Sequence, residues 1–240
     1  MKAPQVIAFD CYGTIIDFDD DGFIAAMAEI AQAQGMPVDG VTLWERFLEA
    51  ARALRDDGKR PAFLPYREAW ARQFEMAWRV LGFAGDGAAA SDYLRRCLAQ
   101  ATVYPETKPV LAALRPHYRL ALLSNADDDF LLECLQRNGL DSEFEAMVSS
   151  EAAGATKPAP AIFHRLAEAL AVPPAAVIYA GDNPQSDVVG ARQAGLAVAW
   201  VNRRGAALPA EVPPPDVEVR TLTELAMVLL APAEGGSRDC

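Results

Sequence analysis

Short apolar runs alternate with amphipathic segments through most of the chain. A run over residues 5–9 ends at Asp10, with Gly13 close behind, and this pattern is typical of a buried parallel strand that delivers a carboxylate at its C-terminal end. Similar runs predict strands at residues 119–123, 146–149, 176–180 and 197–201. Helical periodicity predicts helices at residues 107–114, 128–138, 159–170 and 186–194. Because strand and helix alternate at short spacing, we expect an α/β fold with a doubly wound parallel sheet.

The stretch from Phe18 to Ala101 departs from this alternation. Its apolar residues recur at helical spacing, as in Trp70, Phe74 and Trp78, and it contains three of the four tryptophans but no convincing strand. We therefore expect a helical domain inserted after the first strand. The predicted boundaries place residues 1–17 and 102–231 in the core, 18–101 in the inserted domain and 232–240 in a disordered tail.

The composition excludes several classes of function. The 240 residues carry 22 Lys and Arg against 33 Asp and Glu, a net charge of −11, and so acidic a chain is a poor match for nucleic acid or an anionic membrane surface. The longest apolar stretches are well short of the ~20 residues that cross a bilayer. Four scattered cysteines without a CxxC pair are typical of free thiols in a reducing cytosol, so we expect a cytoplasmic protein. With only two histidines in the chain, carboxylates are the expected catalytic groups.

Polar residues follow the predicted strands at their C-terminal ends, where ligands of open α/β sheets bind. These residues are Asp10 after the first strand, Ser124 and Asn125 after the second, Lys157 in the loop before the helix at 159–170, and Asp182 and Asp187 after the fourth strand. For each of them alone, a role as a helix cap or turn residue is the simpler explanation. Their order along the chain and their places at the strand ends favour one cleft that contains a nucleophilic carboxylate, a hydroxyl, a lysine and an acidic pair.

Four segments, FDCYGT, LLSNAD, TKPAP and YAGDNPQSD, resemble the four motifs of the haloacid dehalogenase-like (HAD) superfamily, in the chain order of that family. The resemblance spans about residues 6–202, and the helical insertion falls where the family has its helical cap domain. It implies a Rossmann-like core with an inserted cap, and it implies that Asp10, after the first strand, is the nucleophile. A carboxylate that attacks phosphorus or an sp³ carbon forms a covalent intermediate, which water then hydrolyses.

The resemblance also implies roles for the other motif residues. Lys157 and a Mg²⁺ ion would neutralise the repulsion between the Asp10 carboxylate and a phosphate group. Ser124 and Asn125 would bind the substrate, and Thr14 would support the loop that carries Asp10 through a hydrogen bond. The expected oxygen ligands of the metal are Asp10, the carbonyl of Tyr12, Asp182 and Asp187.

The motifs differ in the branch of the family that they favour. Tyr12 stands where most phosphatases of the family have an aspartate as general acid, and a non-acidic residue there is a feature of the 2-haloacid dehalogenases, whose leaving halide needs no proton. Asp182, in contrast, resembles the metal-dependent phosphatases, because without a metal it places a second negative charge beside Asp10. The dehalogenases also hold the substrate carboxylate with a cap arginine. Arg46 is the candidate, one residue or about 100° of helix after the matching Glu45.

These features favour Mg²⁺-dependent hydrolysis of a small, anionic phosphate ester through an aspartyl-phosphate intermediate. A Tyr12 phenol would donate a proton only slowly, which indicates esters with good leaving groups. The alternative is an (S)-2-haloacid dehalogenase that acts through an aspartyl ester of Asp10. A third interpretation is a HAD-fold binding module without catalysis, against which the complete set of motif residues argues. No nucleic-acid or membrane partner is expected, and the sequence leaves the oligomeric state open, a homodimer included.

Overall fold

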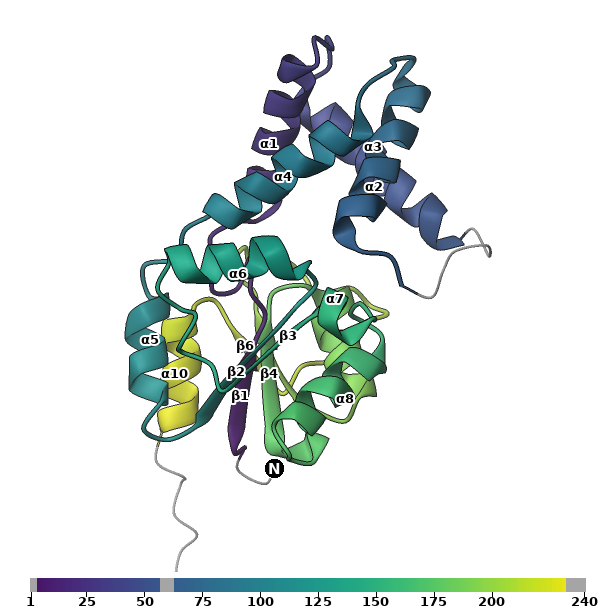
Figure 1. Cartoon of the computed structure of the whole chain (residues 1–240). Coiled ribbons are helices and arrows are strands. Elements are labelled where there is room, and N and C mark those ends of the chain that lie inside the picture. Colours follow the sequence, from purple (N-terminus) through teal and green to yellow (C-terminus); the bar gives the residue numbers. More distant parts are fainter. Residues whose placement is uncertain (1–3, 57–62, 232–240) are drawn as a thin grey trace, which may run out of the picture.

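The core of the molecule is a parallel β-sheet with helices on both faces (Figure 1). The computed structural model describes residues 4–56 and 63–231. Over these residues the sheet is six-stranded, in the order β3-β2-β1-β4-β5-β6, and every strand pairs in parallel with its neighbours. The strands are β1 (Val6–Phe9), β2 (Arg119–Ser124), β3 (Ala146–Ser149), β4 (Val177–Gly181), β5 (Ala197–Val201) and β6 (Val217–Val219). The predicted α/β fold with a Rossmann-like parallel sheet is therefore confirmed, and each strand expected from the sequence is present.

The strands are almost wholly apolar because both faces of the sheet are covered. In β1, Ile7 and Phe9 join one apolar cluster, Val6 and Ala8 join the other, and none of these side chains is exposed. The first face is covered by α5 (Thr107–Leu114), α6 (Asp128–Arg137) and α10 (Leu222–Leu230), and the second by α8 (Pro160–Ala169) and α9 (Val189–Gln193). Shorter connections are α7 (Ser150–Ala153) and the 3-10 helix Pro174–Ala176. β1 lies in the middle of the sheet, between β2 and β4, and Asp10 directly follows it at the C-terminal edge.

The segment between β1 and α5 forms a helical cap above the C-terminal edge of the sheet (Figure 1). It contains α1 (Asp20–Ala33), α2 (Gly40–Asp56), α3 (Tyr66–Leu81) and α4 (Gly87–Gln100), with no strand among its described residues. Trp70, Phe74 and Trp78 repeat at helical spacing on α3, and each is at most 6% exposed, because this side of α3 packs into the cap. The inserted helical domain expected from the sequence is confirmed. None of the described helices is both long and apolar enough to cross a membrane.

The two linkers between core and cap lie side by side. Ile16 and Val103 form an antiparallel bridge, and the N–H of Asp17 donates to the carbonyl of Thr102 at 2.7 Å. The chain therefore passes from core to cap and back through one paired segment. The proposed limits of the cap, residues 18 and 101, flank this segment directly.

The last strand and the last helix of the core, β6 and α10, were not predicted from the sequence. β6 has three residues and follows a proline-rich loop, so it offers no recognisable alternation. The hydroxyl of Thr221 accepts the N–H of Glu224 at 3.2 Å and caps α10, but the apolar residues of this short helix show no clear period. The helix predicted at residues 186–194 begins as a π-helical turn at Pro184–Val188 and continues as α9. Residues 232–240, predicted as a disordered tail, lie outside the described residues.

Candidate active site

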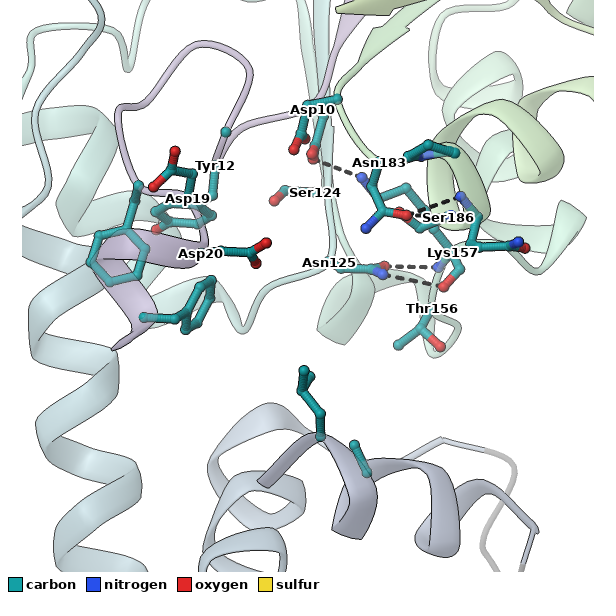
Figure 2. A pocket seen from close by; sticks show the side chains of 18 of the residues that line it. Asp10, Tyr12, Asp19, Asp20, Ser124, Asn125, Thr156, Lys157, Asn183 and Ser186 are labelled. Carbon is teal, nitrogen blue, oxygen red and sulfur yellow. Dashed lines mark hydrogen bonds and ion pairs between the residues drawn. The ribbon is translucent and has the colours of Figure 1, made fainter. Parts of the chain in front are cut away.

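Three neighbouring strands bring predicted site residues to one edge of the sheet. β1 pairs with β2 on one side and with β4 on the other. Asp10 follows β1, Ser124 ends β2 and Asp182 follows β4, so these residues lie together at the C-terminal edge. With Asn125 and Lys157 they line a pocket of about 930 Å³ between the core and the cap (Figure 2).

The ammonium group of Lys157 lies between two carboxylates. Its Nζ is 2.7 Å from Oδ1 of Asp10 and 2.7 Å from Oδ1 of Asp187, and it donates to the hydroxyl of Tyr179 at 3.0 Å. Burial disfavours the charged amine, but the carboxylates of Asp10 and Asp187 outweigh burial and hold the pKa of Lys157 well above its ordinary value. Lys157 is therefore a fixed positive charge beside the candidate nucleophile.

Asn125 fixes the backbone of Lys157. Its amide nitrogen donates to the Lys157 carbonyl at 3.2 Å, and its amide oxygen accepts the Lys157 N–H at 2.7 Å. Both ends of the Asn125 amide therefore contact the backbone of Lys157, while the substrate contact expected of Asn125 stays a prediction. Ser124 is 1% exposed but lines the pocket, and Figure 2 shows it between Asp10 and Asn125.

Three carboxyl groups lie close to one another beside Lys157. Asp10, Asp182 and Asp187 each offer one oxygen, and these atoms are all within 4.8 Å of one another. Burial raises the pKa of Asp10 and Lys157 lowers it, with a balance of about 6. Burial, followed by the charges of Asp187 and Asp10, raises the pKa of Asp182 well above its ordinary value. The site therefore contains three carboxyl groups and one ammonium group.

A small divalent cation fits this excess of carboxylates. Carboxylate oxygens are ligands that Mg²⁺ prefers, and a cation would offset the burial and the repulsion that together raise the pKa of Asp182. Asp187 is already engaged on both oxygens, because Oδ1 accepts from Lys157 at 2.7 Å and Oδ2 accepts from the N–H of Asn183 at 2.9 Å. Asp10 and Asp182 are therefore the better direct ligands, and Asp187 suits a contact through water.

The loop after β1 brings its backbone against Asp182. Gly13 has a φ of +82°, and a Cβ at this position would lie 2.6 Å from Oδ2 of Asp182. The buried hydroxyl of Thr14 donates to Oδ1 of Asp182 at 3.4 Å, so the predicted support from Thr14 reaches Asp182. Arg203, which was not predicted as a site residue, donates to the carbonyl of Gly13 at 3.2 Å and to that of Thr14 at 2.7 Å. The loop after β1 is therefore held by hydrogen bonds to both Asp182 and Arg203.

Two buried aromatic residues that position the site were also missed. The hydroxyl of Tyr179 donates to the carbonyl of Leu123 at 3.0 Å while it accepts from Lys157. The indole N–H of Trp200 donates to the backbone carbonyl of Asp182 at 2.8 Å. Both aromatic residues belong to the apolar runs of β4 and β5, where their spacing signals only burial. The rule that a buried Tyr or Trp needs a polar partner is the signal that could have indicated them.

Tyr12 turns its side chain toward apolar surroundings. The centroid of its ring lies 6.4 Å from that of Phe18 and 6.0 Å from that of Phe130. Burial, together with the thiols of Cys11 and Cys134, raises the pKa of the Tyr12 hydroxyl well above its ordinary value. A phenol held so firmly in its protonated form is a poor proton donor to a leaving group.

Arg46 does not line the pocket. Its guanidinium is 2.7 Å from Glu49 and 3.7 Å from Glu45, on the same helix. The substrate contact predicted for Arg46 therefore finds no support in its position, because the register of α2 turns it toward these glutamates. Arg52, further along α2, does line the pocket.

Aromatic side chains of the cap form much of the opposite wall. Trp44 of α2 and Trp70 of α3 both line the pocket. The ring of Trp44 stacks on that of Phe23 with centroids 4.8 Å apart, and Phe23 lines the pocket as well. The pocket thus has a charged core side and a largely apolar cap side.

Known proteins of two activities resemble this chain. Residues 4–195 match the family model for haloacid dehalogenase-like hydrolases. Haloacetate dehalogenase H-2 from Moraxella sp. (strain B) is 30% identical over 229 residues, which are 91% of this chain and 95% of that protein. A phosphoserine phosphatase from Thermus thermophilus is 37% identical over 168 residues, which are 65% of this chain and 66% of that protein.

The fold also matches solved structures. The HAD-hydrolase YfnB from Bacillus subtilis, solved with bound magnesium, aligns with a TM-score of 0.77 and 23% identity. The alignment covers 95% of this chain and 100% of YfnB. At this identity the likeness concerns the fold.

Proposed function

The chain belongs to the haloacid dehalogenase-like hydrolases, and we propose that within this family it is a Mg²⁺-dependent phosphatase that acts on a small phosphate monoester. The observation that carries this proposal is the position of Asp182, one of whose oxygens lies within 4.8 Å of oxygens of Asp10 and Asp187. Lys157 alone does not balance three carboxylates, and a site that also has to accept a phosphate dianion needs a further positive charge.

Asp10 and Asp182 are the residues that would hold the ion, together with the carbonyl of Tyr12 and, through water, Asp187. When bound, Mg²⁺ supplies positive charge that offsets both the carboxylates and the phosphate oxygens.

Asp10 acts as the nucleophile. Lys157 holds Oδ1 at 2.7 Å, so we assign the attack to Oδ2. A bond forms between this oxygen and phosphorus, and the bond between phosphorus and the ester oxygen breaks. The ester oxygen leaves with the electron pair and takes a proton from water. A second water then attacks the phosphorus of the aspartyl phosphate, which restores the Asp10 carboxylate and releases inorganic phosphate.

Lys157 and Ser124 stabilise the transferred group. The raised pKa of Lys157 keeps it an ammonium group, which can donate to a phosphoryl oxygen without losing its own proton. Asp187 holds the side chain of Lys157 and Asn125 holds its backbone, so the ammonium group does not have to move during the reaction. Ser124 lines the same pocket and offers a hydroxyl donor.

The environment of Tyr12 limits the leaving group. Its phenol is buried against Phe18 and Phe130 and has a pKa well above its ordinary value, so the leaving oxygen obtains no proton from it. Phosphates of phenols and acyl phosphates, whose leaving groups need little protonation, are therefore better substrates than phosphates of simple alcohols.

A 2-haloacid dehalogenase is the second candidate, and Tyr12 is the observation that favours it. In this reaction Asp10 attacks the carbon that carries the halogen, halide leaves without a proton, and water cleaves the aspartyl ester. The relative of 30% identity is named a haloacetate dehalogenase. Against this candidate stand Asp182, an acidic group that a reaction without a metal does not need, and the position of Arg46 outside the pocket.

One assay separates the two candidates. Release of phosphate from p-nitrophenyl phosphate and acetyl phosphate is measured beside release of chloride from 2-chloropropionate, each with Mg²⁺ and with EDTA. We expect release of phosphate that EDTA stops, and none from the Asp10→Asn variant. Release of chloride at an equal rate in EDTA and Mg²⁺, without release of phosphate, would show that the phosphatase proposal is wrong.

A further inference from the structure

The first turn of α3 is capped by the core of the protein. The residue before the helix, Pro65, makes no side-chain cap, although the first N–H groups of a helix need acceptors outside it. Asp127 supplies them: its Oδ1 accepts the N–H of Tyr66 at 2.7 Å, and its Oδ2 accepts the N–H of Arg67 at 2.9 Å. Asp127 is fully buried. A buried carboxylate of the core thus replaces the N-cap residue that the cap helix lacks.

Asp127 sits on the loop that leaves β2, three residues after Ser124, and this loop is rigidly held. The carbonyl of Ala126 accepts the hydroxyl of Ser150 at 2.9 Å and the N–H of Glu151 at 3.3 Å. The preceding residue, Asn125, exchanges two hydrogen bonds with the backbone of Lys157. The consecutive residues 125–127 therefore hydrogen-bond to the backbone of Lys157, to the start of α7 and to the first turn of α3.

A second contact reinforces the same junction. The guanidinium of Arg67 pairs with Glu151, and the other oxygen of Glu151 accepts the N–H of Asp128 at 2.9 Å. The ring of Trp70 also stacks on Phe130 of α6 with centroids 5.7 Å apart. The start of α3 is therefore attached to the core at a place distant in sequence from the two linkers.

The attachment matters for the pocket because α3 forms part of its cap wall. Tyr66, Ala69, Trp70 and Gln73 all line the pocket. Asp127 accepts backbone N–H groups of α3, so it fixes the position of this helix independently of which side chains line the pocket.

We infer that Asp127 is a positioning residue, whose carboxylate caps α3 from the core and thereby holds the cap wall of the pocket at a fixed place over Ser124 and Lys157. Binding of a substrate large enough to reach α3 depends on the two hydrogen bonds of Asp127 to this helix. A substrate too small to reach α3 does not. The inference rests on the proposed phosphatase function only for its kinetic test.

The structural test is hydrogen exchange of single amides, read by NMR on the full chain. We expect the amides of Tyr66 and Arg67 to exchange about tenfold faster in Asp127→Ala than in wild type, because each loses its acceptor. The matched control is Asp129→Ala, two residues further on, which removes an ion pair between Arg95 of the cap and the core but leaves the first turn of α3 capped. If Asp127→Ala does not fold, Asp127→Asn serves instead, since it retains one carbonyl acceptor, and one of the two amides then loses protection. Unchanged exchange of both amides in the folded variant would overturn the inference.

The kinetic test compares substrates of two sizes. For 1-naphthyl phosphate we expect KM to rise about tenfold in Asp127→Ala, while kcat and KM for acetyl phosphate change less than about twofold. Asp129→Ala should match wild type on both substrates. Equal losses on both substrates would show a general structural role and contradict the inference. If wild type releases no phosphate at all, the proposed function fails, while the exchange result still decides whether Asp127 positions α3.

Discussion

Nζ of Lys157 lies 2.7 Å from Oδ1 of Asp10, and both side chains are buried. Burial pushes the pKa of Asp10 up and the ammonium group pulls it down, with a balance of about 6, so the carboxylate is mainly ionised at neutral pH. The same ammonium group contacts Asp187 at 2.7 Å. Lys157 therefore favours the ionised form of Asp10, the proposed nucleophile, and offsets buried negative charge.

Replacing Lys157 should remove activity and weaken the fold together. In Lys157→Met two buried carboxylates lose their partner, so we expect phosphatase activity to fall at least about 100-fold and the free energy of unfolding to fall by roughly 3 kcal/mol. Steady-state kinetics and urea denaturation measure the two effects. Lys108→Met, at an exposed lysine, is the control. A Lys157→Met protein with more than a tenth of wild-type turnover would show that the ammonium group is dispensable.

Without a bound metal, the carboxylate of Asp182 should lower the free energy of unfolding. Its pKa is higher in the folded than in the unfolded protein, so the stability associated with its protonated form is complete below about its ordinary value of 3.8 and is lost as pH rises through the folded pKa. Asp182→Asn resembles the protonated form at every pH. One pKa unit corresponds to about 1.4 kcal/mol, so in EDTA at neutral pH we expect the variant to melt at least about 2–4 °C above wild type.

Two comparisons test that expectation by thermal melting. The difference in Tm should shrink as pH falls toward 4, and Mg²⁺ should raise the Tm of wild type but not that of Asp182→Asn. Asp141→Asn, at an exposed aspartate, should follow wild type throughout. An Asp182→Asn protein that melts below wild type in EDTA would mean that this carboxylate stabilises the fold, contrary to its surroundings.

The hydroxyl of Tyr12 should be dispensable. The Tyr12 ring lies near those of Phe18 and Phe130 and its hydroxyl keeps its proton, so we expect Tyr12→Phe to change kcat/KM by less than about threefold for both aryl and alkyl phosphates. The measurement is kcat/KM over a series of phosphates with leaving groups of increasing pKa. A loss that grows steadily with the pKa of the leaving group would identify Tyr12 as the proton donor after all.

Gly13 should tolerate no side chain. A Cβ there would stand 2.6 Å from Oδ2 of Asp182, and its φ of +82° is strained for other residues. We expect Gly13→Ala to lose most activity and about 1–3 kcal/mol of stability. Gly154→Ala separates the two causes, because its φ is +61° and nothing lies within 4 Å of the added Cβ. If both variants keep equal activity, close approach to Asp182 is not needed for catalysis.

The elements that could be predicted from the sequence are those whose pattern of apolar residues matches their burial in the fold. β1, β2 and β4 are buried on both faces, so each appears in the sequence as an apolar run that ends in a polar residue. Since parallel strands share one C-terminal edge, the meeting of Asp10, Ser124 and Asp182 followed from that pattern alone. β6 has three residues and is paired on one side only, so its apolar pattern is too short to recognise.

The rest of the site depends on tertiary contacts that leave no periodic signal. Arg203 follows β5 yet supports the loop after β1, through carbonyls 189 and 190 residues away in the chain. Asp127 resembles an ordinary helix cap in the sequence, but it caps a helix of the inserted domain. Arg46 was suggested by a resemblance in position alone, and in the structure its guanidinium pairs with Glu49 of the same helix.

The central claim, that Asp10 carries a phosphoryl group during turnover, is tested most directly by rapid quenching and peptide mass spectrometry. Wild type is mixed with Mg²⁺ and acetyl phosphate, quenched in acid and digested, with Asp10→Asn treated in parallel. We predict that the peptide containing Asp10 gains the mass of one phosphoryl group in wild type and that the corresponding peptide of Asp10→Asn does not. An unmodified Asp10 peptide during steady release of phosphate, or an ester on Asp10 formed from 2-chloropropionate in EDTA, would contradict the account.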